Sequence, residues 1–244
     1  MRLTRVYVDT PVNTGKRLVV EGSAANHITR VLRLRNGDAL TVFDGSGAEF
    51  GARIEEFRKD AVIVCVDEQR TVDRESPLSL TLAQGISRGE RMDWIIQKAT
   101  ELGATRIVPV FTQRSVVRLD DKQAERKLQH WRAITIAACE QCGRNRLPEL
   151  VTPVDFFDVL PETFTPNSTR LLLSPHAELR IDDLRELHGG VTVLIGPEGG
   201  LDDVEQEAAM AAGFKSVRMG PRVLRTETAA IAALTILQRY FGDL

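Results

Sequence analysis

The feature that most constrains this chain is the alternation of short apolar segments with helical segments after residue 77. Five apolar segments have the length and composition of strands: 78–83, 106–111, 171–173, 191–195 and 216–219. Helical periodicity separates most of them, and a last helix is predicted from about Thr226 to Phe241. Strands joined through helices make right-handed crossovers and therefore run parallel. The pattern predicts an α/β domain built on a mostly parallel sheet.

Two of these helices carry clear end signals. One places its apolar residues on one face between Met92 and Leu102 and is expected to stop at Gly103. Another, from about residue 203 to 212, begins with an Asp-x-x-Glu pattern at Asp202 and Glu205. This pattern predicts a capping box, in which each residue satisfies a backbone N–H of the other.

The first seventy residues have a different rhythm, because short apolar runs alternate with glycine turns. The runs typical of strands are 17–20, 39–43, 50–54 and 61–66. Only the segment 24–34 has a helical pattern. Several short strands of this kind predict a small β-barrel. We therefore expect a barrel domain at 1–70, a polar linker at 71–77 and the α/β domain at 78–244.

Composition excludes several classes of protein. The chain is 43% hydrophobic and 27% charged, which is typical of a globular protein and not of a disordered one. It has no stretch near the roughly 20 apolar residues that a membrane span needs, and no apolar signal-peptide core follows its start. We expect a cytoplasmic protein without a membrane partner.

Arginine supplies most of the positive charge, although the formal net charge is only −2. The densest early cluster consists of His27, Arg30, Arg33 and Arg35. A planar guanidinium grips phosphate with two hydrogen bonds, so the cluster is a candidate RNA contact. The alternative is an ordinary solvated face.

Three loops that leave strands of the α/β domain are rich in glycine and proline: 174–176, 196–200 and 220–228. In an open α/β sheet, ligands bind outside the carboxyl ends of the strands. One such loop alone would be read as a turn, but three in sequential units predict a ligand cleft. Rigid backbone N–H and C=O groups in such loops suit the edge of a purine.

Other common sites are excluded by their missing motifs. The chain has no phosphate-binding P-loop, no dinucleotide fingerprint and no hydrolase nucleophile elbow. The pair Cys139 and Cys142 has C-x-x-C spacing, but no second pair accompanies it and the histidines show no ligand spacing. We expect no metal. The final apolar helix, by contrast, must be buried on several sides, by a dimer interface or by an enclosed chain end.

The segments 195–200 and 219–229 resemble the two signature loops of the SPOUT RNA methyltransferases. The likeness is greatest to the bacterial 16S rRNA (uracil-N3)-methyltransferase family, which the segments 27–33, 91–103 and 140–144 also resemble. Pro221 and Val223 are variations inside the last loop, and the likeness otherwise spans the whole chain.

The resemblance implies a PUA-like barrel followed by a SPOUT-type parallel sheet with a C-terminal trefoil knot. It also implies a homodimer that binds S-adenosylmethionine in a bent form and methylates N3 of a uridine in 16S rRNA of the small ribosomal subunit. Two alternatives stay open: a SPOUT methyltransferase acting on tRNA or on a ribose 2′-hydroxyl, and a non-catalytic RNA-binding assembly factor.

Loop placement together with the resemblance predicts the site residues. The predicted cofactor contacts are Leu173, Ile195, Gly196, Gly200, Met219, Gly220, Leu224 and Thr226. The predicted RNA contacts are Arg2, Arg5, Arg30 and Arg33 of the barrel, and Arg88, Arg91, Arg114 and Arg144 near the cleft.

Methylation of N3 requires that the base lose a proton, and a nearby cation would stabilise the resulting anion. Arg225 is the candidate cation, unless it forms a structural ion pair with Glu227. Glu198 is a candidate general base or substrate-orienting acceptor, unless it caps the helix that follows. The sequence does not identify the target nucleotide, the protomer that supplies each RNA contact, or whether RNA is recognised free or assembled.

Overall fold

The computed structural model describes residues 4–115, 120–162 and 168–244. The chain divides into two compact units, Met1–Glu75 with Ile136–Leu147, and Ser76–Thr135 with Pro148–Leu244. The first boundary between the units, between Glu75 and Ser76, lies inside the polar segment 71–77. The first unit also takes in a segment from the middle of the chain, residues 136–147.

The first unit contains a five-stranded sheet in the order β1-β3-β4-β5-β2. Its strands are β1(Arg5–Tyr7), β2(Arg17–Glu21), β3(Ala39–Phe43), β4(Glu49–Phe57) and β5(Ala61–Arg70). β1 runs parallel to β3, and the other pairs are antiparallel. The four predicted strand segments of this unit are confirmed. Val42, Val62 and Val64 are fully buried in its core.

The predicted helix over 24–34 is confirmed with shifted ends. It consists of α1(Gly22–Asn26) and a π-helical turn, η1(His27–Leu32). Arg33 has φ of 53°, and this left-handed conformation ends the turn two residues before the predicted end. Ile28 is fully buried and anchors the turn to the core, while Arg30 and Arg33 are exposed.

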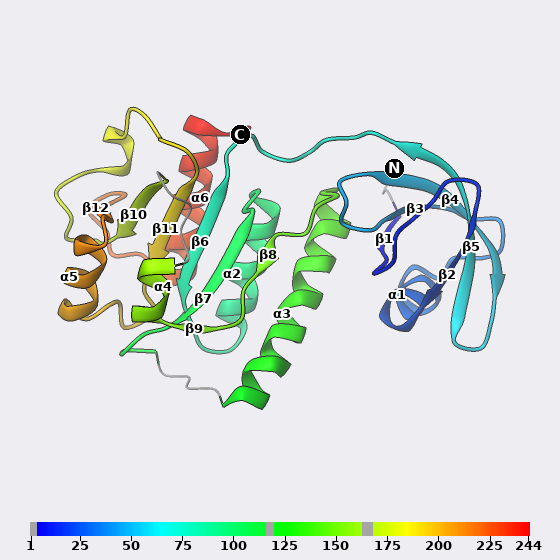
Figure 1. Cartoon of the computed structure of the whole chain (residues 1–244), viewed down its shortest axis with the longest axis horizontal. Coiled ribbons are helices and arrows are strands. Elements are labelled where there is room, and N and C mark those ends of the chain that lie inside the picture. The colour runs from blue at the N-terminus through cyan, green and yellow to red at the C-terminus, as the bar shows by residue number, and fades with distance from the viewer. Residues whose placement is uncertain (1–3, 116–119, 163–167) are drawn as a thin grey trace. The chain divides into compact units, whose positions relative to one another are not determined.

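The second unit contains a parallel sheet, in the order β12-β10-β11-β6-β7-β8, with β9 also pairing with β7 (Figure 1). The strands are β6(Leu80–Gly85), β7(Arg106–Phe111), β8(Glu149–Leu150), β9(Val154–Asp155), β10(Thr169–Leu173), β11(Val191–Ile195) and β12(Lys215–Val217). Every described pairing in this sheet is parallel, which confirms the prediction from the strand–helix alternation.

The helical elements of the second half are α2(Glu90–Glu101), α3(Asp121–Cys142), α4(Phe156–Glu162), the 3₁₀ turn η2(Ile181–Asp183), α5(Asp203–Ala211) and α6(Thr226–Phe241). The end signals are confirmed. Gly103 has φ of 79° just beyond α2, and the backbone N–H of Glu205 donates to Asp202 at 2.8 Å in the capping box of α5.

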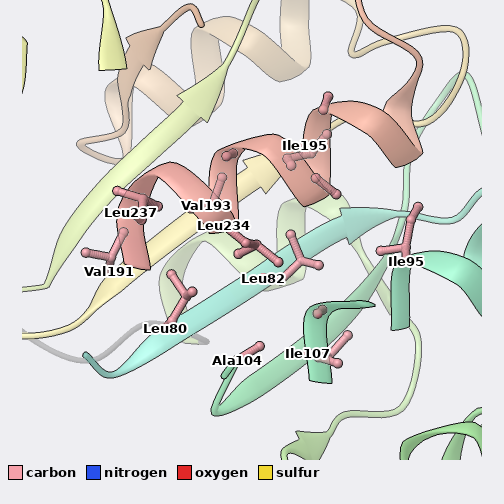
Figure 2. Packing of buried hydrophobic residues seen from close by; sticks show 14 of the residues in the cluster. Leu80, Leu82, Ile95, Ala104, Ile107, Val191, Val193, Ile195, Leu234 and Leu237 are labelled. Carbon is pink, nitrogen blue, oxygen red and sulfur yellow. The ribbon is translucent and has the colours of Figure 1, made fainter. Parts of the chain in front are cut away.

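Helices cover both faces of the parallel sheet. Side chains alternate along a strand, so Leu82 and Val193 enter the core shared with α2 and α6 (Figure 2). Ala83 and Leu194 enter a second core with α4 and α5. With both faces filled, the carboxyl edge of the strands is the part of the sheet that remains available for a site.

Helix α6 packs against α2 and the sheet through one face. Ala230, Ala233 and Leu237 are buried on that face. Ile231 and Ile236 are only half-buried, although the helix is apolar almost all round. The single chain therefore covers less of α6 than its composition predicts.

Candidate functional site

Three loops meet at the carboxyl edge of the parallel sheet. One follows β10, one follows β11, and one joins β12 to α6. The three strands are neighbours, because β10 lies between β11 and β12. The loops surround a cavity of about 540 Å³. This volume lies within the roughly 300–1,000 Å³ that small-molecule sites occupy.

The structure brings all eight predicted cofactor positions onto the wall of this one cavity. They are Leu173, Ile195, Gly196, Gly200, Met219, Gly220, Leu224 and Thr226. Both predicted catalytic residues, Glu198 and Arg225, line the same cavity.

Glycines allow the loop after β11 to fold tightly. A Cβ at Gly196 would lie 2.8 Å from the carbonyl carbon of Gly200. A Cβ at Gly85, at the end of β6, would lie 2.5 Å from the ring of Pro197. Only a residue without a side chain fits at either position. The backbone groups of this loop are therefore held in fixed places.

Buried hydrogen bonds join the start of α6 to the ends of two strands. The hydroxyl of Thr226 donates to the carbonyl of Gly196 at 2.7 Å. The side-chain amide of Gln84, fully buried on β6, donates to the Thr226 hydroxyl at 3.0 Å. Bonds of this kind fix the two walls of the cavity relative to each other.

Glu198 is held by donors at the start of α2. Its Oε1 accepts a hydrogen bond from the backbone N–H of Arg88 at 3.0 Å and from the Arg91 guanidinium at 2.7 Å. Burial raises the pKa of Glu198, but these hydrogen bonds outweigh it and leave the pKa below its usual range. Because Asp202 caps α5, Glu198 does not cap the helix that follows it.

Arg225 precedes α6 and is exposed, and no ion pair or side-chain hydrogen bond is recorded for it within the described residues. Glu227, its alternative structural partner, lies instead 3.9 Å from the guanidinium of Arg91. Arg225 therefore has a free guanidinium at the cavity wall.

The other predicted arginines of the second unit are also exposed. Arg88 lies just before α2, and Arg91 lies in its first turn. Arg114 donates to the carbonyl oxygens of Gly199 and Leu201, at 3.0 and 3.3 Å. Arg91 and Arg114 line the cavity, so two of these three cations border it directly.

Two predicted RNA contacts are buried, which corrects the expectation for them. Arg5 is 3% exposed and forms an ion pair with Glu49. Arg144 is 4% exposed and forms an ion pair with Glu75 at 2.6 Å. Neither guanidinium is available to a phosphate, because carboxylates inside the first unit already bind both.

The other predicted RNA contacts of the first unit are Arg2, Arg30 and Arg33. Arg30 and Arg33 are exposed, and no ion pair is recorded for them within the described residues. Arg2 lies outside the described residues, so its predicted RNA contact stays a prediction.

Six polar residues of the cavity wall are not among the predicted site residues: Ser174, His176, Gln206, Arg218, Arg222 and Glu227. Within the described residues, Arg218 and Glu227 each keep one buried polar atom without a hydrogen-bond partner, Nε and Oε2 respectively. The only signal for Glu227 was its place inside the third glycine–proline loop. Arg218 comes directly after a strand that the sequence did mark, at the edge where ligands bind.

The cysteines and acidic residues offer no metal centre within the described residues. No group of three or more His, Cys, Asp and Glu side chains there is arranged to hold an ion. Burial raises the pKa of the Cys139 thiol to about 12, so it stays protonated and is a poor ligand. Within the same residues, no helix has the length and apolar character that a membrane crossing requires.

Family models match both units. Residues 74–238 match an RNA methyltransferase domain, and residues 20–66 match an RNA methyltransferase PUA domain. The ribosomal RNA small subunit methyltransferase E of Buchnera aphidicola subsp. Schizaphis graminum is 35% identical over 243 residues, which cover 100% of this chain and 98% of that protein. The Bacillus subtilis protein of the same name is 34% identical over a match that covers 89% of this chain and 88% of that protein.

Two solved structures are similar to this chain over almost its whole length. A methyltransferase of Legionella pneumophila in complex with bound SAM has a TM-score of 0.96 and 41% identity, with 100% of each chain covered. The ribosomal RNA small subunit methyltransferase E of Neisseria gonorrhoeae, bound to S-adenosyl methionine, has a TM-score of 0.92 and 36% identity, with 99% of each chain covered. The likeness therefore includes the PUA-like first unit as well as the α/β unit.

Proposed function

This chain belongs to the RNA methyltransferase family, and we propose that it transfers a methyl group from S-adenosylmethionine to N3 of a uridine in 16S rRNA. The observation that carries the proposal is the cavity that gathers all eight predicted cofactor positions. Relatives named for small-subunit rRNA, similar over 98% and 88% of their lengths, support the substrate. Two similar structures that hold the methyl donor support the cofactor.

The residues of the cavity fit this methyl donor. S-adenosylmethionine carries an ammonium group, a carboxylate, ribose hydroxyls and an adenine edge, so its site needs both donors and acceptors. Arg218 offers an unpartnered donor, its Nε. Ile195, Gly196 and Met219 line the same cavity, where their backbone can supply further donors and acceptors. The bound cofactor would supply a methyl group already activated on a sulfonium.

The protein's task is then to position the uridine and remove its proton. N3 lies on the base-pairing edge, so the target base must be unpaired or flipped out. We assign Arg225 to stabilise the uracil anion, because its exposed guanidinium lines the cavity and is free. We assign Glu198 to orientation, since it fixes Arg91 and its lowered pKa makes it a weak base.

We propose that the PUA-like unit binds RNA through Arg30 and Arg33, and that Arg88, Arg91 and Arg114 guide the strand to the cavity. All five side chains are exposed. Arg5 and Arg144 are not part of this surface, because both are buried in ion pairs. In domain terms, residues 1–70 would be the RNA-binding domain and 78–244 the methyltransferase domain.

We also propose a C-terminal trefoil knot and a homodimer. The hydrogen bonds from Gln84 to Thr226 and from Thr226 to Gly196 support a last segment tucked between the ends of β6 and β11. Half-buried Ile231 and Ile236 on α6 support a second copy that covers this helix. We place the enzyme in the cytoplasm because its rRNA substrate is there.

The test is nucleoside mass spectrometry of small-subunit rRNA from cells with and without this protein. We expect N3-methyluridine to disappear without the protein and to return when it is supplied. An unchanged N3-methyluridine peak contradicts the proposal, and so does the loss of a ribose-methylated nucleoside in its place.

A further inference from the structure

Glu227 lines the cavity and has one carboxylate oxygen that no described residue satisfies. The residue lies in the first turn of α6, and its side chain is 16% exposed. Its Oε2 is buried and has no hydrogen-bond partner in the part of the chain that the structure describes. A buried polar atom without a partner costs free energy. The atom therefore gains stabilisation when a bound molecule donates a hydrogen bond to it.

The two carboxylates beside Arg91, Glu198 and Glu227, differ in the number of hydrogen-bond donors they receive. Glu198 receives two donors on one oxygen, from the Arg88 backbone and the Arg91 guanidinium. Among residues 4–115, 120–162 and 168–244, Glu227 has only the more distant ion pair with Arg91, at 3.9 Å. Glu227 is thus the carboxylate with free acceptor capacity, and it lies on the side of the cavity that faces the start of α2.

The pairing edge of uracil has a matching pattern. N3–H is its only donor, and a carbonyl acceptor flanks it on each side. A carboxylate next to a guanidinium offers an acceptor beside a donor. We propose that Glu227 accepts the N3 proton of the target uridine as general base, while Arg91 donates to the neighbouring uracil carbonyl. This inference rests on the proposed function.

The proton transfer balances within these groups. The N3–H bond breaks, its proton forms an O–H bond on Oε2 of Glu227, and the electron pair stays on N3. The electron pair on N3 would then form a bond to the methyl carbon while the methyl–sulfur bond of the donor breaks and its electron pair stays on sulfur, which leaves as a neutral thioether. The Glu227 carboxyl returns its proton to water. Cytosine carries no proton on N3, so its lone pair would face the carboxylate and be rejected.

The other charged or titratable side chains that line the same cavity are Arg91, Arg114, His176, Glu198, Arg218, Arg222 and Arg225. An alternative role for Glu227 is the ordinary stabilisation of a helix start by an acidic residue in its first turn. That role changes thermal stability without changing how the methylation rate depends on pH.

The experiment compares Glu227→Gln, Glu227→Asp and the matched control Glu207→Gln, an exposed residue of α5 outside the cavity. Single-turnover methylation is measured across pH, on small subunits from cells that lack the protein. We expect Glu227→Gln to lower the rate about 10²–10⁴-fold at neutral pH. The defect should shrink as pH rises, because hydroxide then removes the N3 proton. Glu227→Asp should recover part of the rate, and Glu207→Gln should match the unsubstituted protein.

Calorimetry with S-adenosylmethionine and a melting curve complete the test. We expect Glu227→Gln to bind the methyl donor as the unsubstituted protein does. Weakened binding of the donor, or a rate defect that is equal at every pH, would overturn the inference. If the unsubstituted protein makes no N3-methyluridine, the proposed function fails first. If Glu227→Gln makes it at the full rate, only the role of Glu227 fails.

Discussion

Two clusters of charged side chains in this molecule use the same residue types to different ends. In the first unit, Glu49 is bound by Arg5 and by Arg74, the latter at 3.1 Å. Arg5 also donates to the carbonyl of Arg144 at 3.1 Å and to the side chain of Asn145 at 2.6 Å. The side chains of Arg5 and Glu49 are 2% and 6% exposed. This cluster is closed, because its members mainly bind one another.

The cluster at the cavity is open. Arg91 is shared between Glu198, at 2.7 Å, and Glu227, at 3.9 Å. Its side chain is 45% exposed, and Arg225 beside the same cavity is free. A closed network stabilises a fold, whereas an open one keeps charge available for a ligand.

The largest effect is expected from Glu49→Ala, which removes the acceptor of the closed cluster. Two guanidinium groups would lose their carboxylate, one of them in a buried site. Breaking a buried pair in this way costs about 3–5 kcal/mol. Urea unfolding should show that loss. The control is Glu56→Ala, which removes an exposed pair with Arg58 and should leave the unfolding midpoint in place. Equal effects of the two variants would contradict the contrast.

The next effect is expected from Arg225→Ala in the open cluster. Removing a charge that stabilises the reacting anion should lower methylation about 10²–10³-fold. Affinity for S-adenosylmethionine, measured by calorimetry, should be unchanged. The midpoint of urea unfolding should also be unchanged, because the side chain is exposed and free. Full turnover by this variant would remove Arg225 from the mechanism.

The sequence distinguishes the two clusters only in part. It predicts the cavity well, because strands that end in glycine–proline loops at one sheet edge form a local and periodic signal. It does not separate Arg5 from Arg30, since both are arginines near the start of the chain. Buried Arg5 donates a hydrogen bond to Asn145, 140 positions away, and no local pattern encodes such a contact.

Other differences between prediction and structure have the same origin. The strands β8 and β9 have two residues each, too few to show a period. The helical turn before Arg33 ends early because the backbone of Arg33 has a left-handed conformation. Arginine rarely adopts this conformation. The open acceptor of Glu227 depends on what its neighbours leave unpaired, and only the folded cavity shows this.

A smaller effect is expected from pH on the closed cluster. Burial raises the pKa of Glu49, but the hydrogen bonds and charges of Arg5 and Arg74 outweigh this effect and hold the pKa below its usual value of about 4.3. A carboxyl with a lowered folded-state pKa stabilises the fold above its unfolded pKa and loses that contribution as pH falls through the folded value. The stability gap between the unsubstituted protein and Glu49→Gln should therefore narrow below about pH 4. A gap that stays constant with acidification would show that the charge of Glu49 contributes nothing.

The smallest effect is expected from the exposed arginines of the first unit, and it extends the contrast to RNA. Each side chain that neutralises a phosphate releases counterions, so its loss should flatten the slope of log affinity against log salt by roughly 0.7–0.9. Arg30→Gln and Arg33→Asn test this on an unmodified 16S rRNA transcript, and asparagine tolerates the left-handed backbone at position 33. Arg58→Gln is the control, because its guanidinium is exposed but already bound by Glu56 at 3.0 Å. If all three variants flatten the slope equally, exposure alone decides RNA contact. If only Arg30→Gln and Arg33→Asn do so, freedom from a carboxylate partner decides it, in the first unit as at the cavity.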